Sequence, residues 1–321
     1  MNIVFQHDHP LPVKKYGGIE RIIYWQMVDL VRLGHCVTLI GHPDSIVGPA
    51  GIKLIPMKEN WVAQVPKDTD LIHLYYNNIP TKDYPVLNTL QGNGKKGELF
   101  QKNTVFISKV HARNHGSNHY IYNAIDLEEY PFPEKENPLE LENFMFLAKG
   151  SWSVKNLKDC VRAAKKSKHH LHIAGGKAIL PSRFIHNHGM VGGEEKLTIM
   201  NNCDALLFPV RWHEPFGIAI IEAMAMGMPV IGSPYGSLPE LIPKMAGHIV
   251  NNYQELLTTL QIKQNPFDRE EIRKYIEEKF CIRVLTNSYL GYYEKIIRGE
   301  ELHQDFPTWQ LEKEAVELLP F

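Results

Sequence analysis

The chain has 321 residues, which exceeds the usual size of one domain and favours two. Its apolar content of 44% and charged content of 22% are typical of a folded globular protein and exclude a disordered one. Residues 1–127 hold 13 Lys and Arg against 10 Asp and Glu, and the remainder holds 22 against 26. This asymmetry is too mild to predict nucleic-acid binding, but it is compatible with weak attraction of the first half to anionic lipid.

The cysteines and the apolar runs indicate the compartment. The four cysteines (Cys36, Cys160, Cys203 and Cys281) match no zinc pattern, so we expect free thiols in a reducing cytosol. Residues 1–10 lack the regions of a signal peptide, and no apolar run approaches the roughly 18 residues of a membrane span. We therefore expect a cytoplasmic protein whose membrane association, if any, is weak, peripheral and at the inner face.

The first half alternates predicted strands with a helix. Residues 2–7 are typical of a buried strand, and residues 19–33 predict an amphipathic helix that ends at Gly34. Further strands are predicted at 36–41, 52–56, 71–75, 85–90 and 105–108. This alternation predicts a parallel sheet in an α/β domain.

The loop before the first helix contains Tyr16, Gly17 and Gly18. Paired glycines at a helix start let free backbone N–H groups approach an anion, aided by the positive helix end. The spacing does not match the G-x-G-x-x-G fingerprint of dinucleotide sites. A plain flexible loop is the alternative interpretation.

Two other features of this half are interpreted as structural. Asp68-Thr69-Asp70 precedes an apolar run instead of following one, so we interpret it as a turn and not as a metal site. His73 lies within the predicted strand, where we expect a hydrogen-bonded core histidine.

The second half begins after a proline- and charge-rich segment, 128–143, whose composition is typical of a linker or hinge. A strand is predicted at 144–148, followed by Lys149 and by Lys155 at the start of the next helix. Lysines in this position can hold a diphosphate through charge and helix dipole, although solvated surface lysines are the alternative. The strand 171–174 ends in a glycine turn that includes Gly176, at the strand end where ligands bind open α/β sheets.

Five histidines (His169, His170, His172, His186 and His188) surround this strand. We expect them to be structural or on the surface, because the pattern distributes them over both strand faces and loops, without a carboxylate or cysteine at ligand spacing. No metal site is predicted.

The stretch 213–239 carries the strongest signal. Its sequence is HEPFGIAIIEAMAMGMPVIGSPYGSLP, in which seven residues separate Glu214 from Glu222. The apolar residues 218–226 predict a helix with Pro215 in its first turn and Gly227 as its C′ cap. Glu222 is anomalous within this helix, because a buried carboxylate needs a polar partner. That partner is either a ligand or a nearby lysine.

This stretch closely resembles the signature of glycosyltransferase family 4, the retaining GT-B enzymes. The resemblance rests on Glu214-Pro-Phe-Gly, Glu222-Ala-Met-Ala-x-Gly, Pro-Val and Gly236-Ser-Leu-Pro-Glu. It implies two Rossmann-like domains whose parallel sheets face each other across a cleft. On this basis we expect an N-terminal acceptor-side domain at 1–127, a linker at 128–143 and a nucleotide-sugar-binding domain at 144–285. A final helix and tail at 286–321 are expected to cross back to the first domain.

The resemblance also assigns roles to residues. Glu222 is expected to bind the ribose, and Glu214 the hydroxyls of the transferred sugar. The N–H groups of Phe216, Gly217 and Ile218 are expected to serve the sugar or phosphate. The other expected donor-site residues are Gly17 and Gly18 at the donor phosphate, Lys155 with Lys149 at the diphosphate, Gly176 at its glycine turn, and Val191 in the segment 188–193 that meets the base.

The sequence departs from the family pattern at three positions. Gln91 stands where many members carry histidine near the transferred sugar, and glutamine cannot carry a proton between groups. Ala124 replaces a glycine in the domain-boundary segment. Lys149 lies six residues before Lys155, whereas members usually place an arginine about five before it, so Lys155 is the better candidate. The residues expected to be catalytic are Gln91, Glu214 and Lys155.

The expected activity is hexosyl transfer without metal or other cofactor, from a UDP-sugar first and a GDP-sugar next. The acceptor is expected to be a glycan or lipid-linked glycan, as in polysaccharide or lipopolysaccharide biosynthesis. Two alternatives remain open: a nucleotide-sugar-binding pseudo-enzyme, favoured by Gln91 and Ala124, and a nucleotide-sugar epimerase of the same architecture.

Overall fold

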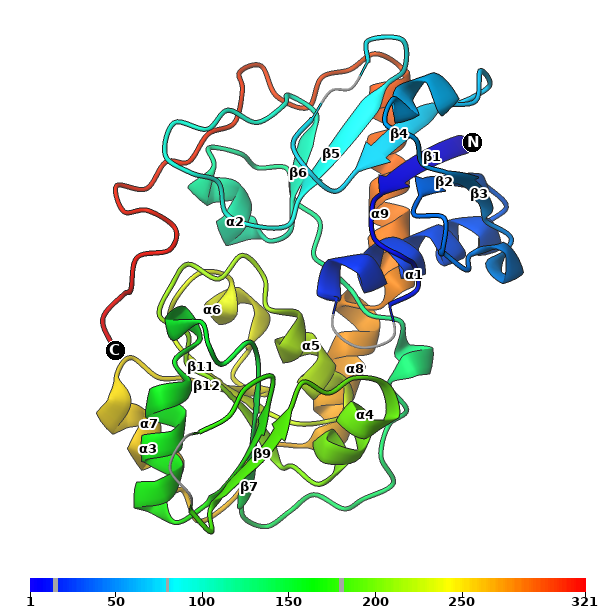
Figure 1. The fold of residues 1–321 in the computed structure, drawn as a ribbon. Helices are drawn as coiled ribbons and strands as arrows, with labels where there is room; N and C mark the ends of the chain where they lie inside the picture. Colours follow the sequence, from blue (N-terminus) through cyan, green and yellow to red (C-terminus); the bar gives the residue numbers. More distant parts are fainter. Residues whose placement is uncertain (14–16, 79–80, 179–181) are drawn as a thin grey trace. The chain divides into compact units, whose positions relative to one another are not determined.

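The computed structural model describes residues 1–13, 17–78, 81–178 and 182–321 (Figure 1). They form two compact units. Unit 1 contains Met1–Val13, Gly17–Ile125 and Cys281–Glu312, and unit 2 contains Asp126–Phe280 and Lys313–Phe321. Each unit has a six-stranded sheet in which every pair of neighbouring strands is parallel. The prediction of two Rossmann-like α/β domains is therefore confirmed.

The sheet of unit 1 has the order β3-β2-β1-β4-β5-β6. Its strands are β1 (Asn2–His7), β2 (Cys36–Gly41), β3 (Lys53–Pro56), β4 (Leu71–Leu74), β5 (Val86–Leu90) and β6 (Thr104–Phe106). The helices are α1 (Gly18–Arg32), α2 (Lys109–Asn114) and α9 (Ile282–Ile297), with short 3-10 turns η1 (Gly48–Ala50) and η2 (Trp61–Gln64).

The sheet of unit 2 has the order β12-β11-β10-β7-β8-β9. Its strands are β7 (Asn143–Leu147), β8 (His170–Ala174), β9 (Ile185–Gly189), β10 (Ala205–Phe208), β11 (Val230–Gly232) and β12 (Gly247–Ile249). The helices are α3 (Leu157–Ser167), α4 (Gly193–Asn201), α5 (Ile218–Ala225), α6 (Leu238–Leu241), α7 (Tyr253–Thr259) and α8 (Arg269–Lys279), with 3-10 turns η3 (Leu127–Glu129) and η4 (Ser153–Lys155).

Both sheets follow the same doubly wound topology. In each, the first strand lies centrally, the next two continue to one side, and the chain then crosses to the other side. The strand order reverses between β1 and β4 in unit 1 and between β7 and β10 in unit 2. Ligands of open α/β sheets bind at the carboxyl ends of the strands beside such a reversal. Burial agrees with this topology, because every residue of β4 and β10 is buried, as expected for central parallel strands.

A buried polar network joins α9 to the sheet of unit 1. His73 on β4 is hydrogen-bonded through Nδ1 to the Tyr293 hydroxyl (2.7 Å) and through Nε2 to Thr89 Oγ1 (2.8 Å). Gln26 of α1 donates to the same Tyr293 hydroxyl at 3.1 Å. Burial lowers the pKa of His73 to about 3, so the ring is neutral. The expectation of a hydrogen-bonded core histidine is confirmed, and the network explains why α9 packs with unit 1.

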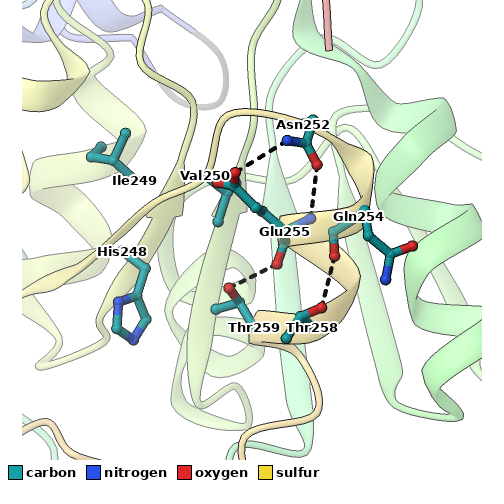
Figure 2. Close-up of a pocket in the computed structure, with 8 residues that line it drawn as sticks. All are labelled: His248, Ile249, Val250, Asn252, Gln254, Glu255, Thr258 and Thr259. Carbon is teal, nitrogen blue, oxygen red and sulfur yellow. Dashed lines mark hydrogen bonds between the residues drawn. The ribbon is translucent and has the colours of Figure 1, made fainter.

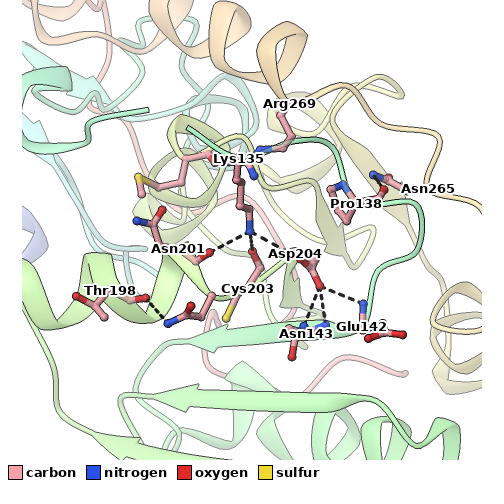
Figure 3. Close-up of polar contacts among 12 residues, drawn as sticks. Lys135, Pro138, Glu142, Asn143, Thr198, Asn201, Cys203, Asp204, Asn265 and Arg269 are labelled. Carbon is pink, nitrogen blue, oxygen red and sulfur yellow. Dashed lines mark hydrogen bonds and ion pairs between the residues drawn. The ribbon is translucent and has the colours of Figure 1, made fainter. Parts of the chain in front are cut away.

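The segment expected to be a linker lies in unit 2, where Lys135 attaches it to the core (Figure 3). Lys135 Nζ donates to the carbonyl of Asn201 at the end of α4 (3.0 Å) and to that of Cys203 (2.9 Å), and lies 3.7 Å from Asp204 Oδ1. Burial, together with the nearby charge of Arg269, lowers the pKa of this lysine. Asp204 also accepts hydrogen bonds from the segment just before β7 (Figure 3), so the segment is held at the amino ends of β7 and β10.

Most predicted elements are present with ends shifted by one to three residues, for example α1 at Gly18–Arg32 against 19–33. Helices predicted at 196–202, 253–260, 269–280 and 281–298, and strands predicted at 205–209 and from 230, are present as α4, α7, α8, α9, β10 and β11. Among the described helices and strands, β9, β12, α2 and α6 were not predicted. All four are short, and β9 has the sequence IHNHG, in which histidine and glycine obscure the strand pattern.

Candidate functional site

The loops at the carboxyl ends of β7 and β10 carry charged residues that the sequence analysis assigned to a site. The loop after β7 holds Lys149 and Lys155, and the loop after β10 holds Glu214. These loops flank the point where the strand order reverses, so the topology alone brings two segments about 60 residues apart to one place.

Lys155 and Glu214 form a close ion pair. The distance from Lys155 Nζ to Glu214 Oε2 is 2.5 Å, and the side chains are only 11% and 7% exposed. Lys155 is the last residue of η4, and a single residue, Asn156, separates it from α3. Asn156 adopts a left-handed conformation (φ 59°). The two residues predicted to handle diphosphate and sugar are thus in direct contact.

The two loops are fastened to each other beside this pair. Arg211 N–H donates to the carbonyl of Val154 (2.7 Å), and Asn156 Nδ2 donates to the carbonyl of Pro209 (3.0 Å). Trp212 Nε1 donates to Glu214 Oε2 at 2.7 Å, and Lys155 Nζ lies 4.8 Å from the centre of the Trp212 ring. Glu214 Oε2 therefore accepts from both an ammonium and an indole, which fixes the carboxylate.

The loop after β11 closes against the backbone of Glu214. Gly236 has φ +62°, and a Cβ there would come within 2.2 Å of the Glu214 carbonyl oxygen. Ser237 N–H donates to that carbonyl at 2.9 Å, and its Oγ donates to the carbonyl of Phe216 at 2.8 Å. The Gly236-Ser237 part of the signature is therefore explained by this close approach.

Helix α5 follows the pair and begins at Ile218, with Gly217 (φ +86°) as its N-cap. The prediction that Pro215 lies in the first turn is wrong, because the left-handed Gly217 separates it from the helix. At the other end the prediction is confirmed: Met226 is the C-cap and Gly227 (φ +75°) follows in the left-handed conformation.

Glu222 has protein partners, which corrects the expectation that a ligand is needed to explain it. Its Oε1 accepts from Lys196 Nζ of α4 (2.7 Å) and from the Tyr130 hydroxyl (2.5 Å). Lys196 Nζ also donates to that hydroxyl at 2.9 Å. All three side chains are buried. The alternative of a lysine partner is therefore what the structure shows, since α4 packs its one buried lysine toward the apolar helix α5.

Two arginines of α8 cap the carboxyl end of α5. Arg269 Nη2 donates to the carbonyl of Met226 (2.9 Å), and Arg273 Nη1 donates to that of Ala225 (2.9 Å). Arg273 also donates to the carbonyl of Tyr130 at 2.7 Å. Cations at a helix end complement its dipole, so α8 holds both the helix and the tyrosine that contacts Glu222.

The glycine turn after β8 lies against the loop after β7. Gly150 N–H donates to the carbonyl of Gly175 (2.8 Å), and a Cβ at Gly175 would come within 2.2 Å of the Ala148 carbonyl oxygen. A Cβ at Gly176 would reach 3.0 Å from the Cα of Gly150. Lys149 and Gly176 are thus on adjacent loops. Val191 is buried in the short segment between β9 and the N-cap of α4.

The predicted residues of unit 1 occupy two further places. Gly17 and Gly18 form the start of α1, where a Cβ at Gly17 would come within 2.8 Å of Glu20 Oε2; Tyr16 lies outside the described residues. Gln91 lies just beyond β5 and forms a reciprocal amide pair with Asn123. Gln91 Nε2 donates to Asn123 Oδ1 (3.1 Å), and Asn123 Nδ2 donates to Gln91 Oε1 (2.8 Å).

The loop after Gln91 is held by two histidines of α2 and its C-cap. His115 Nε2 accepts from Gly94 N–H at 2.9 Å, and His111 Nε2 contacts the carbonyl of Gly92 at 3.0 Å. Burial lowers the pKa of both rings, for His115 to about 4. The loop that carries Gln91 therefore rests on neutral imidazoles.

The residues that the sequence interpretation missed are the partners of the predicted ones: Trp212, Tyr130 and Lys196. A signal for Lys196 was present, because it shares the buried face of α4 with Ile199 and Met200. A lysine at that spacing from apolar residues predicts a buried carboxylate elsewhere. Tyr130 gave no signal, since it lies in the linker-like segment.

The histidines near β8 and β9 are not distributed over both strand faces as expected. Four of them share a face of the sheet, where His170 pairs with His186 (2.8 Å) and His172 with His188 (3.0 Å). They do not straddle the two faces as expected, because alternate residues of both strands carry them. Within the described ranges, no group of three or more His, Cys, Asp or Glu side chains has a geometry suited to a metal ion.

An open pocket of about 480 Å³ lies beside α7, lined by residues that include His248 and Asn252 (Figure 2). Its polar groups bond to one another: Asn252 Oδ1 accepts from Glu255 N–H, and the Thr258 and Thr259 hydroxyls donate to carbonyls one turn earlier (Figure 2). None of the predicted site residues lines it, so we do not assign it to the reaction.

The two doubly wound sheets define an α/β protein of the GT-B fold class. AviGT4, a glycosyltransferase involved in avilamycin A biosynthesis, matches with a TM-score of 0.76 at 20% identity, over 97% of this chain and 100% of that one. Anabaena Alr3699/HepE, solved in complex with UDP and glucose, matches with a TM-score of 0.65 at 15% identity, over 92% and 99%.

Residues 142–261 match the family model described as Glycosyl transferases group 1. That segment is therefore a glycosyltransferase domain, and it contains Lys155, Glu214 and Glu222.

Two curated proteins are also similar. An uncharacterized 41.2 kDa protein in the cps region of Klebsiella pneumoniae is 25% identical over 194 residues, 54% of this chain and 54% of that protein. A probable sucrose-phosphate synthase of Thermosipho melanesiensis is 38% identical over 87 residues, 26% of this chain and 20% of that protein. The matched part spans about half of the first relative.

Among the described residues, no helix is long and apolar enough to cross a membrane.

Proposed function

We propose that the chain is a retaining, metal-independent glycosyltransferase of family 4. It moves a hexose-type sugar from a nucleotide diphosphate sugar to a glycan or glycolipid acceptor. The observation that carries the proposal is the Lys155–Glu214 pair at the carboxyl ends of β7 and β10, inside the glycosyltransferase domain. A cation for a leaving diphosphate and a carboxylate for sugar hydroxyls are the two groups that such a transfer needs side by side.

In this proposal each group has one task. Lys155, with Lys149, offsets the charge that develops on the leaving diphosphate, and such electrostatic help is usually the largest catalytic contribution. Glu214 accepts hydrogen bonds from the sugar hydroxyls. Glu222, held by Lys196, binds the ribose. The N–H groups at the start of α5, which follows Glu214, complete the anion site.

The reaction exchanges one bond for another at the anomeric carbon. Its bond to the diphosphate oxygen breaks, and a bond to the acceptor oxygen forms on the same face, which retains the configuration. The acceptor proton passes to the departing phosphate oxygen. No metal is required in this scheme, because lysine and helix-end charges replace it.

The donor proposed first is a UDP-sugar, with a GDP-sugar next. The likeness to a structure solved with UDP and glucose supports this order. The relative in a cps region supports polysaccharide biosynthesis as the setting, with a lipopolysaccharide-type or other lipid-linked acceptor. The acceptor is assigned to the N-terminal domain, where residues 1–127 carry 13 Lys and Arg against 10 Asp and Glu. This small positive excess fits peripheral attraction to an anionic membrane at its cytoplasmic face.

The decisive experiment combines binding with turnover. Thermal shift against UDP-, GDP- and ADP-glucose identifies the nucleotide, because a ligand at 100 times its Kd stabilises the folded state by about 2.7 kcal/mol. NMR of the incubation with an acceptor panel then shows whether the product keeps the donor's anomeric configuration. Binding without turnover would indicate a pseudo-enzyme, and conversion of the donor without acceptor would indicate an epimerase. An inverted product would refute the retaining mechanism.

A further inference from the structure

The loop after β7 exposes a large aromatic side chain beside the proposed reaction site. Trp152 is 46% exposed, although an indole is among the costliest side chains to leave in water. Its ring lies 6.4 Å from that of Trp212, at 79° to it. Lys149 Nζ lies 5.1 Å from the centre of the Trp152 ring.

The two indoles differ in how they are held. Trp212 is fixed, because the only polar atom of its side chain donates to Glu214 and its ring lies under Lys155. Trp152 is held through its backbone, whose N–H donates to the carbonyl of Lys149 (2.9 Å) and whose carbonyl accepts from Lys155 N–H (2.9 Å). The exposed ring is therefore positioned by the same turn that positions the catalytic lysine.

We infer that Trp152 and Trp212 form an aromatic corner that receives the ring of the transferred sugar. A pyranose has an apolar face of C–H groups and a rim of hydroxyls, so it fits a site with an aromatic wall and a carboxylate next to it. Here the wall is the exposed indole, and the carboxylate is Glu214, whose Oε2 is already engaged. The sugar hydroxyls would then reach Oε1.

The chemistry of the neighbours favours a sugar over a nucleobase in this corner. Glu214 and Lys155 border Trp212 directly, and both are assigned to the sugar and the diphosphate in the proposed function, on which this inference rests. The base is assigned to the segment around Val191, which follows β9 on a different loop. Trp152 is therefore a specificity-determining residue for the sugar part of the donor.

The test compares UDP with UDP-glucose by calorimetry on the wild type, Trp152→Ala and Trp152→Phe. We expect Trp152→Ala to bind UDP as the wild type does and to bind UDP-glucose about 3- to 10-fold more weakly, the size of one aromatic contact. Trp152→Phe keeps an aromatic face and should recover most of that affinity. In turnover, the alanine variant should raise KM for UDP-glucose more than it lowers kcat.

The outcomes separate this inference from the proposed function. If the wild type binds neither UDP nor UDP-glucose, the UDP-sugar proposal fails and takes the inference with it. If the wild type binds both and Trp152→Ala leaves their affinity ratio unchanged, the inference alone is overturned. An equal loss for both ligands would assign Trp152 to the nucleotide and also overturn it. Because the side chain is half exposed, the alanine variant is expected to fold, which circular dichroism checks.

Discussion

Replacing Lys196 with methionine would remove the charge that faces Glu222 while keeping most of the side-chain volume. In the structure Lys196 Nζ bonds to Glu222 Oε1 at 2.7 Å and to the Tyr130 hydroxyl at 2.9 Å. The lysine and glutamate side chains are 9% and 10% exposed, so water does not screen the pair. The substitution therefore removes the lysine charge from beside a buried carboxylate that also accepts from the tyrosine hydroxyl.

Removing one partner of a buried ion pair typically costs about 3–5 kcal/mol. We expect Lys196→Met to lose that much of the free energy of unfolding of unit 2. The matched control is the triple variant Lys196→Met, Glu222→Leu, Tyr130→Phe, which replaces the whole polar cluster by apolar groups of similar size. It should be within about 1–2 kcal/mol of the wild type, because an apolar replacement of a buried pair is often close to neutral.

Urea unfolding of the intact chain measures both variants, with circular dichroism for overall structure and tryptophan fluorescence as a second probe. Trp152 and Trp212 lie in unit 2 and the other tryptophans in unit 1, so fluorescence reports on the unfolding of both units. Two separate transitions would each be fitted, since the units need not unfold together. A loss below about 1 kcal/mol for the single variant, or a triple variant less stable than the single one, would refute the reasoning.

Three further predictions concern the reaction and pH. Glu214→Ala should abolish transfer without weakening UDP binding, whereas Glu222→Ala should weaken UDP binding about 10-fold or more, or 1.4 kcal/mol. Calorimetry with matched rate assays checks both, and unchanged affinity of the Glu222 variant would remove the ribose assignment. Lys155→Met should lower kcat by roughly 100-fold or more, in the range of a lost electrostatic stabiliser; a pre-steady-state measurement of the chemical step tests it. His73 has a folded pKa of about 3, below its unfolded 6.5, so its contribution to stability is present above pH 6.5 and lost as pH falls toward 3. Between those values the free energy of unfolding should fall by up to about 1.4 kcal/mol per pH unit as the pH is lowered. Urea unfolding at a series of pH values should show a weaker pH dependence of that free energy for His73→Gln than for the wild type.

The fold was predictable because its signals are local and repeated. Buried parallel strands such as β4 and β10 are continuous apolar runs, and helices such as α5 end at glycine. Two of the elements that were missed contain histidines with a hydrogen-bonding role of their own. In β9 alternate histidines bond across to β8, and in α2 a histidine supports the loop after Gln91.

The site was predictable only in part, since spacing identifies the residues but not their partners. The E-x7-E pattern drew attention to Glu214 and Glu222, which the structure places just before α5 and within it. Nothing in the spacing indicated that Glu214 would bond to Trp212, two residues earlier, or that Glu222 would face Lys196. These contacts depend on the tertiary positions of η4 and α4, which a pattern within one stretch does not contain.

Each glutamate of the signature is matched by one lysine, and the placement of the two pairs suggests different uses. Lys196 and Glu222 lie on two helices and are locked further by Tyr130, whose carbonyl Arg273 holds. Lys155 instead lies on a loop at the carboxyl end of the sheet, and apart from Glu214 its side chain contacts aromatic ring faces.

A diphosphate could attract Lys155 away from Glu214 at modest cost, because both partners would gain new hydrogen bonds. The lysine would bond to phosphate and the glutamate to sugar hydroxyls. The same exchange at Lys196 would break two hydrogen bonds in the buried interior, those to Glu222 and Tyr130. If the first pair is exchanged during binding and the second is not, Glu214→Gln should raise UDP affinity by releasing Lys155, whereas Glu222→Gln should not. Calorimetry of the two glutamine variants with UDP decides this, and equal effects at both positions would contradict it.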